Sequence, residues 1–217
     1  MKLNTNDTLL FIGDSITDCG RNRPVGEGGF GQLGNGYVAQ VDALLHAVYP
    51  ERNIRILNTG ISGNTVRDLK QRWQEDVLDL KPDWLSIMIG TNDVWRQFDQ
   101  PLNPAYHVYL TEYEQTLKEL LALTRPLLKG LILMTPYYLE PNEDDPMRAT
   151  MDVYRSAMRN IADEFDAILV DTQAAFDAIS EHVYLSSLAI GWDRVHPGQR
   201  GHMTLAREFL KAIQFEL

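Results

Sequence analysis

Short, mainly apolar runs alternate with stretches of helical periodicity along the whole chain. Each run is three to six residues long and is bounded by polar or glycine-bearing turns. Such short continuous runs are typical of strands buried on both faces. The predicted strands are Leu9–Ile12, Ile54–Leu57, Trp84–Ile89, Leu131–Met134 and Ile168–Val170.

Between these runs, apolar residues recur at steps of three or four, which predicts amphipathic helices. Such helices are expected over Val66–Leu80, Leu110–Leu120, Met151–Phe165 and Leu205–Ile213. The second should end near Pro126, because proline lacks the N–H that a helix interior needs.

Strands that alternate with helices through short connections indicate right-handed crossovers and a parallel sheet covered on both faces. We therefore expect a single domain over 1–217, a three-layer α/β/α sandwich with a five-stranded, flavodoxin-like parallel sheet. In such sheets the functional site lies beyond the carboxyl ends of the strands. Two segments interrupt the alternation and are expected to be loops: 21–36, which holds six glycines, and 97–106, which holds two prolines.

Composition narrows the range of functions. The net charge is −10 at pH 7, which argues against a nucleic-acid or anionic-membrane surface. No apolar run approaches the roughly 20 residues that span a bilayer, and the polar residues 1–7 do not resemble a signal peptide. Cys19 is the only cysteine, so an intrachain disulfide is excluded, and we expect a small buried or half-buried side chain there. These features favour a cytoplasmic protein.

Ser15 follows the first predicted strand in the turn Gly13-Asp14-Ser15-Ile16-Thr17. A serine there is presented at the carboxyl edge of the sheet, and it has two interpretations. It could cap a helix through its hydroxyl, which is the commoner use of an isolated Gly-Asp-Ser. It could instead be a nucleophile, which requires a base elsewhere in the chain.

A base is available after the fifth predicted strand, where Asp193 and His196 are three residues apart. A carboxylate at that spacing can accept the proton of one imidazole nitrogen and leave the other nitrogen basic. The alternative is a helix start with Asp193 as its cap and Pro197 in the first turn. A metal site is less favoured, because one histidine and one aspartate leave most ligand positions unfilled.

Acyl transfer also needs hydrogen-bond donors for the developing oxyanion. The glycine-bearing turn around Gly63 follows the second strand, and Asn92 follows the third. Each alone is explained by ordinary turn chemistry. Four polar turns at one edge of one sheet, however, together supply a nucleophile, a base, an orienting carboxylate and two donors.

The blocks Gly-Asp-Ser-Ile, Asn-Thr-Gly-Ile-Ser-Gly-Asn-Thr, Gly-Thr-Asn-Asp and Asp-Arg-Val-His resemble the ordered signature blocks of SGNH/GDSL hydrolases, over residues 9–210. The resemblance implies Ser15 as nucleophile, His196 as general base and Asp193 as its orienter. It also implies an oxyanion hole made by the backbone N–H groups of Ser15 and Gly63 and the side chain of Asn92. No cofactor and no metal are expected.

More narrowly, the segments 11–21, 89–96 and 132–136 resemble a bacterial subgroup of intracellular acetylxylan esterases. That resemblance implies removal of acetyl groups from short xylo-oligosaccharides and assembly into homo-oligomers, up to octamers. Trp95, Trp192 and Tyr184 could stack on sugar rings, and the two tryptophans could narrow the acyl pocket. His46, His107, His182 and His202 lack ligand spacing and are expected to have surface or structural roles.

Two other functions remain open. A thioesterase or lysophospholipase could use the same triad on longer acyl chains. A non-catalytic sugar-binding module could keep the fold, although it would not need nucleophile, base and oxyanion donors together.

Overall fold

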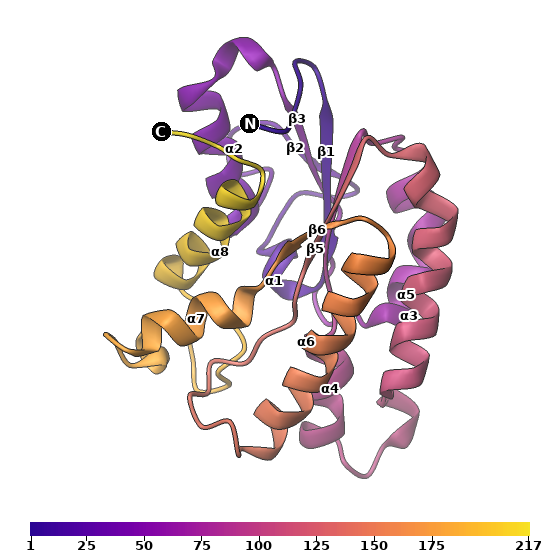
Figure 1. Cartoon of the computed structure of the whole chain (residues 1–217), viewed down its shortest axis with the longest axis vertical. Helices are drawn as coiled ribbons and strands as arrows, with labels where there is room; N and C mark the ends of the chain where they lie inside the picture. The colour runs from indigo at the N-terminus through magenta and orange to yellow at the C-terminus, as the bar shows by residue number, and fades with distance from the viewer.

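A six-stranded sheet runs through the centre of the computed structural model, which describes residues 1–217 (Figure 1). The strand order is β2-β3-β1-β4-β5-β6. The strands are β1 (Thr8–Gly13), β2 (Gly26–Glu27), β3 (Arg55–Asn58), β4 (Trp84–Met88), β5 (Gly130–Met134) and β6 (Ile168–Val170). All neighbours pair in parallel except β2, which is antiparallel to β3. The five predicted strands and their flavodoxin-like order are confirmed.

The sixth strand is a correction to the sequence analysis, which expected only irregular structure over 21–36. β2 is two residues long and pairs Gly26 with Asn58 and Glu27 with Leu57. Two residues carry no periodicity, so the pattern could not predict it. Its position is set by tertiary contacts, including an ion pair between Glu27 and Arg55 across the two strands.

Helices cover both faces of the sheet (Figure 1). One layer contains α2 (Tyr37–Val48), α7 (Thr172–Ser180) and α8 (Gln199–Ala212), and α8 packs against the other two. The opposite layer contains α3 (Val66–Trp73), α4 (Thr91–Asp99), α5 (Leu110–Thr124) and α6 (Pro146–Glu164). A single turn, α1 (Ser15–Asp18), follows β1. The predicted three-layer sandwich is confirmed.

Five short helical segments complete the elements: η1 (Pro50–Arg52), the π-helical η2 (Gln74–Leu78), η3 (Pro104–Tyr106), η4 (Arg125–Leu127) and η5 (Leu185–Ser187). Pro126 lies in η4, directly after α5 ends at Thr124, as predicted. The loop predicted over 97–106 begins too early, because Gln97–Asp99 form the last turn of α4. The helix ends at Asp99, and Gln100 before Pro101 is non-helical, as steric clash with a following proline demands.

The core consists of 54 buried hydrophobic residues in one cluster. The strand residues are buried on both faces of the sheet, which explains why their apolar runs are continuous rather than alternating. Phe11 of β1 shows how the layers are joined, because its ring lies 4.9 Å from Phe209 of α8 and 5.7 Å from Tyr37 of α2. Burying one such side chain is worth about 1.5–3 kcal/mol.

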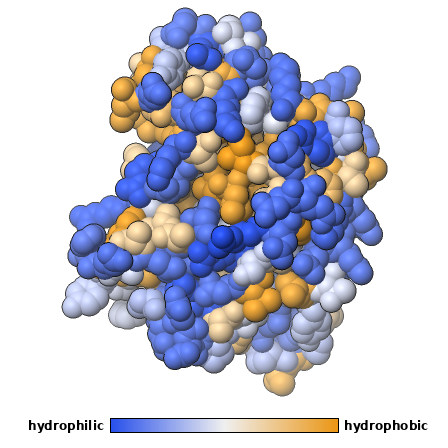
Figure 2. Space-filling model, in the orientation of Figure 1, coloured by the Kyte–Doolittle hydropathy of each residue, from blue (hydrophilic) through white to orange (hydrophobic).

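The surface is mostly hydrophilic, with apolar side chains gathered in a hollow over the edge of the sheet (Figure 2). A hollow of about 600 Å³ lies there, between β6, α7 and α8, and its lining includes Leu169, Ala174 and Ala178. No helix combines the length and the apolar character that crossing a membrane requires.

Candidate active site

Ser15 is presented at the end of β1 by a turn that the sequence dictates locally. A side chain at Gly13 would collide with the Met88 carbonyl of the neighbouring strand β4, so only glycine fits there. Asp14 caps the following helical turn, because its carboxylate accepts the N–H of Ile16 at 2.9 Å. Ser15 is then the first helical residue and stays partly exposed at the carboxyl edge of the sheet.

A chain of hydrogen bonds joins Ser15 to two residues about 180 positions away in the sequence. Ser15 Oγ lies 2.8 Å from His196 Nε2, and His196 Nδ1 lies 2.7 Å from Asp193 Oδ2. These three side chains are the triad predicted from the sequence, and the structure brings them together.

Asp193 is held in the form that this arrangement needs. Partial burial acts to raise its pKa, but hydrogen bonds from the His196 ring and from the backbone N–H groups of Val195 and His196 outweigh burial, so the pKa lies below its ordinary value. The two backbone bonds are 2.9 and 3.0 Å long and go to Oδ1. An ionised Asp193 accepts the Nδ1 proton of His196 and leaves Nε2 as the acceptor for the Ser15 hydroxyl.

The segment that carries Asp193 and His196 is fastened to the chain that follows β5. The N–H of Leu139 donates to the Arg194 carbonyl at 2.8 Å, and the Tyr137 hydroxyl donates to the Val195 carbonyl at 3.2 Å. The side chains of Arg194 and Glu140 form an ion pair. His196 is thus held in place by the segment that follows β5.

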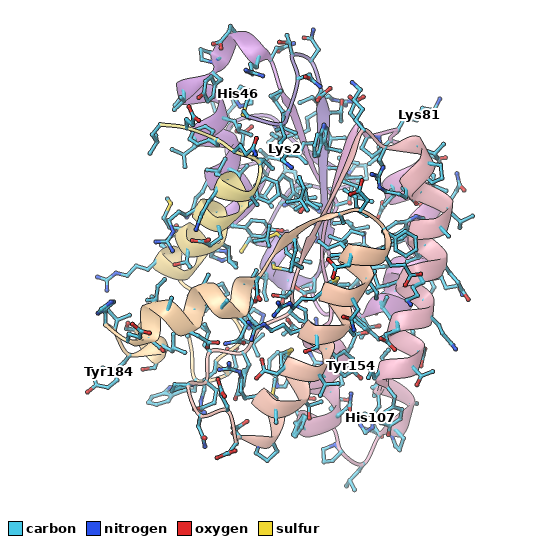
Figure 3. All side chains as sticks on the ribbon, in the orientation of Figure 1. Lys2, His46, Lys81, His107, Tyr154 and Tyr184 are labelled. Atoms are coloured by element: carbon cyan, nitrogen blue, oxygen red, sulfur yellow. The ribbon has the colours of Figure 1, made fainter.

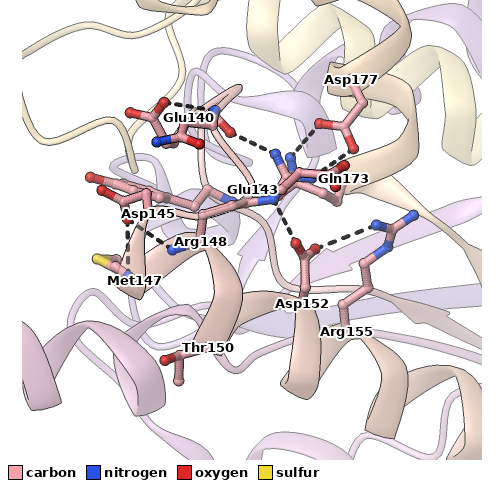
Figure 4. Close-up of polar contacts among 12 residues, drawn as sticks. Glu140, Glu143, Asp145, Met147, Arg148, Thr150, Asp152, Arg155, Gln173 and Asp177 are labelled. Carbon is pink, nitrogen blue, oxygen red and sulfur yellow. Dashed lines mark hydrogen bonds and ion pairs between the residues drawn. The ribbon is translucent and has the colours of Figure 1, made fainter.

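Figure 4 shows a buried arginine, Arg148 of α6, that in turn supports the segment following β5. Its side chain is only 1% exposed, donates to the Glu140 carbonyl at 2.6 Å and pairs with Asp152 and Asp177 at 2.8 and 2.9 Å. Such full pairing offsets the cost of removing a charged guanidinium from water. The Arg148 network therefore fixes the backbone on which the Asp193–His196 segment rests.

The predicted oxyanion donors lie at the same edge of the sheet. Gly63 has a φ of +82°, a left-handed conformation that glycine adopts without strain, and its backbone N–H donates to no other group of the protein. Asn92 is the second residue of α4, and its Nδ2 donates to the Asn64 carbonyl at 3.0 Å. That bond brings the Asn92 amide against the turn that holds Gly63.

Two buried carboxyl groups at this edge were not singled out in the sequence analysis. Burial raises the pKa of Asp14 to about 6, against the lowering effects of the Ile16 N–H and of His196. Burial likewise raises the pKa of Asp93 to about 7. Asp93 accepts the N–H of Val66 at 3.0 Å and so ties the start of α3 to the start of α4. Their signal in the sequence was an acid next to Ser15 or Asn92, within the polar segment that follows an apolar strand.

The two tryptophans lie in different surroundings. The Trp95 ring meets the His196 ring edge-on, with centroids 5.9 Å apart. The Trp192 side chain is fully exposed, so it forms no wall around Ser15 within this chain. Tyr184 is also exposed and projects from the segment after α7 (Figure 3). Of the predicted aromatic contacts, the structure places only Trp95 beside the triad.

The remaining candidates have structural surroundings. Cys19 is half-buried, as predicted, and its Sγ lies 3.2 Å from His202 Nε2, while His202 Nδ1 accepts the N–H of Tyr37. Burial lowers the pKa of His202 to about 4 and raises that of the Cys19 thiol to about 11, so both are neutral. His46 and His107 lie at opposite ends of the molecule (Figure 3). No three His, Cys, Asp or Glu side chains are grouped so that they could hold a metal ion.

Comparison with known proteins agrees with this geometry. Residues 11–203 match the GDSL-like lipase/acylhydrolase family. The chain belongs to this family. It is 62% identical over 216 residues to an acetylxylan esterase of Geobacillus stearothermophilus, an alignment that covers 100% of this chain and 98% of the relative.

Solved structures give the same result. The crystal structure of that esterase superimposes with a TM-score of 0.97 and covers 100% of this chain and 98% of the other. Catalytic mutants of the same esterase, with a serine, an aspartate or a histidine replaced by alanine, match equally well. An alpha/beta hydrolase from the metagenome of Lake Arreo, Spain, is 51% identical, with a TM-score of 0.95 and coverage of 99% and 98%.

Proposed function

We propose that this member of the family is a serine esterase that removes acetyl groups from short xylo-oligosaccharides, with Ser15, His196 and Asp193 as its catalytic triad. The observation that carries the proposal is the hydrogen-bonded chain from Ser15 Oγ through His196 to Asp193. The substrate class is supported by the 62% identity to an acetylxylan esterase over the whole chain.

In the acylation step, Ser15 Oγ attacks the carbonyl carbon of the acetyl ester and gives its proton to His196 Nε2. Asp193, 2.7 Å from Nδ1, stabilises the imidazolium that forms. The carbonyl oxygen becomes an oxyanion and accepts hydrogen bonds from the backbone N–H groups of Ser15 and Gly63 and from Asn92 Nδ2. The intermediate then collapses, the sugar oxygen leaves with the proton from Nε2, and an acetyl group stays on Oγ.

Deacylation repeats these steps with water. His196 Nε2 takes a proton from a water molecule, whose oxygen attacks the acetyl carbonyl, and the same three donors hold the second oxyanion. Collapse breaks the bond to Ser15 Oγ, which takes back its proton, and acetate is released. Each preorganised donor raises the rate by stabilising the transition state, where the negative charge on the oxygen develops.

The test is release of acetate from acetylated xylo-oligosaccharides by the purified protein and its variants. Ser15→Ala should lower turnover by several orders of magnitude while the protein stays folded, since the remaining groups cannot form the acyl-enzyme. His196→Ala should do the same, and Asp193→Ala should keep more activity because Asp193 acts through the ring without touching the substrate. Turnover near the parental value in Ser15→Ala would contradict the nucleophile assignment.

The proposal extends to assembly and location. Phe30, Tyr184 and Trp192 are large side chains that are almost fully exposed in the single chain, and exposed aromatic side chains are enriched at protein interfaces. We infer a homo-oligomer, up to an octamer, that works in the cytoplasm. Light scattering on the protein as it elutes from a size-exclusion column measures the number of subunits. Cell fractionation measures the cellular location. A monomer at all concentrations would contradict the assembly.

A further inference from the structure

Arg96 lies one helical turn beyond Asn92 on α4, and its guanidinium is held on three sides. Nη2 donates to Asn92 Oδ1 at 3.0 Å, and Nη1 pairs with Asp99. The guanidinium carbon lies 4.7 Å from the centre of the Trp95 ring, a distance typical of a cation–π contact. Only 22% of the side chain is exposed, so the group is largely fixed.

The contacts of the Asn92 amide determine which way round it lies. A side-chain amide has an oxygen that accepts and a nitrogen that donates two hydrogens, and a rotation of 180° exchanges them. Here Nδ2 faces the Asn64 carbonyl, an acceptor, while Oδ1 faces Arg96, which can only donate. In the rotated amide, oxygen would face oxygen and N–H would face the cation. Only the observed orientation satisfies both neighbours.

This orientation matters for catalysis. One Nδ2 hydrogen goes to Asn64, and the other remains for the oxyanion. If the amide rotated, its oxygen would face the developing negative charge and would repel it. A cation on the amide oxygen also polarises the group and makes its N–H a stronger donor.

We infer that Arg96 is a positioning residue of the esterase: it locks the Asn92 amide with its free N–H toward the reacting carbonyl. The inference rests on the proposed function, in which Asn92 is an oxyanion donor. Because Arg96 acts through Asn92, its effect should appear in turnover rather than in substrate binding, and only while Asn92 is present.

The experiment is a double-mutant cycle on a soluble acetyl ester, combining Arg96→Met with Asn92→Ala. In the parental background, Arg96→Met should lower kcat about tenfold and change KM less than about twofold, a part of the 10²–10³ that loss of one whole donor costs. In the Asn92→Ala background the same change should cost less than about twofold, since residues that act through one another are not additive. Arg96→Lys keeps a charged donor, so its kcat should lie between those of the parental protein and Arg96→Met.

Matched variants separate this role from a structural one. Arg207→Met removes another paired arginine, on α8 beside Glu208 and away from the triad, and should leave kcat unchanged. If Arg96→Met does not fold, Arg96→Gln keeps a neutral donor and should show a smaller loss with the same dependence on Asn92. A full tenfold loss in the Asn92→Ala background, or a loss confined to KM, would overturn the inference. Failure of the proposed function is seen separately, as parental turnover in Ser15→Ala, whereas parental turnover in Asn92→Ala alone would overturn the inference by removing the donor on which Arg96 acts.

Discussion

Single hydrogen bonds carry much of the chemistry proposed for this protein, and Asn92 is the clearest case. In the proposed mechanism its side-chain donor acts where charge develops, so Asn92→Ala should lower kcat by about 10²–10³ with a smaller change in KM. Steady-state kinetics on an acetyl ester measures both constants. A variant changed mainly in KM would instead assign Asn92 to substrate binding.

Asp93 predicts a pH dependence of stability at the same scale. Burial raises its pKa from the ordinary 3.8 to about 7, so the folded protein holds this proton more tightly than the unfolded chain does. Its contribution to the free energy of unfolding is therefore largest below about pH 4, falls as the pH rises toward 7, and is constant above that. Asp93→Asn removes the ionisation and can still accept the N–H of Val66.

The Asp93→Asn variant should accordingly be more stable, relative to the parent, at pH 8 than at pH 5. Urea unfolding at the two pH values measures the difference. Asp144→Asn, which removes the same charge from an exposed position, corrects for the change in net charge. A difference between Asp93→Asn and the parent that is the same at both pH values would contradict the prediction.

At the scale of elements, the segment that carries Asp193 and His196 depends on helix α6 through Arg148. Replacing Arg148 by Met should lower the free energy of unfolding by about 2–3 kcal/mol, less than for a fully buried pair, because Asp152 and Asp177 keep some access to solvent. Arg159→Met, which removes an exposed partner of Asp171, should cost less than about 1 kcal/mol. Denaturant unfolding compares the two; equal losses would show that the network adds nothing beyond a surface pair.

At the scale of the whole molecule, we expect the Trp95 ring beside the triad to limit the length of the acyl group that the site accepts. Trp95 lies against His196, so acetyl esters should be preferred, propionyl esters should remain measurable, and butyryl and octanoyl esters should fall progressively. One methylene is worth only about 1–3 kcal/mol even in a well-shaped pocket. Trp192, being fully exposed, cannot add to this limit within one chain.

Specificity constants across the four esters of one leaving group test this preference. Trp95→Ala should raise the octanoyl-to-acetyl ratio, because it removes a large ring beside His196. A rise toward octanoyl in the parental protein would favour a thioesterase or lysophospholipase and would leave the triad untouched. Parental protein inactive on every ester would favour a sugar-binding module.

The sequence by itself determined the five parallel strands, the three-layer arrangement and the residues at the sheet edge. Strands buried on both faces require continuous apolar runs. The run predicted over Leu131–Met134, for example, is observed as strand β5, Gly130–Met134. The residues after each strand meet at one edge in any parallel sheet, so Ser15, Asn92 and His196 could be placed together from the order of elements alone.

Only the tertiary structure decided what surrounds these residues. Strand β2 is too short to have a hydrophobic period. The last turn of α4 is mainly polar and lies close to Pro101, so the sequence shows no helical periodicity there. The pKa of Asp93 depends on burial, and the orientation of Asn92 depends on Arg96 and on the Asn64 carbonyl of another turn. Apart from the contact of Arg96 with Asn92 on the same helix, these properties arise from contacts between segments far apart in the chain, which no local pattern records.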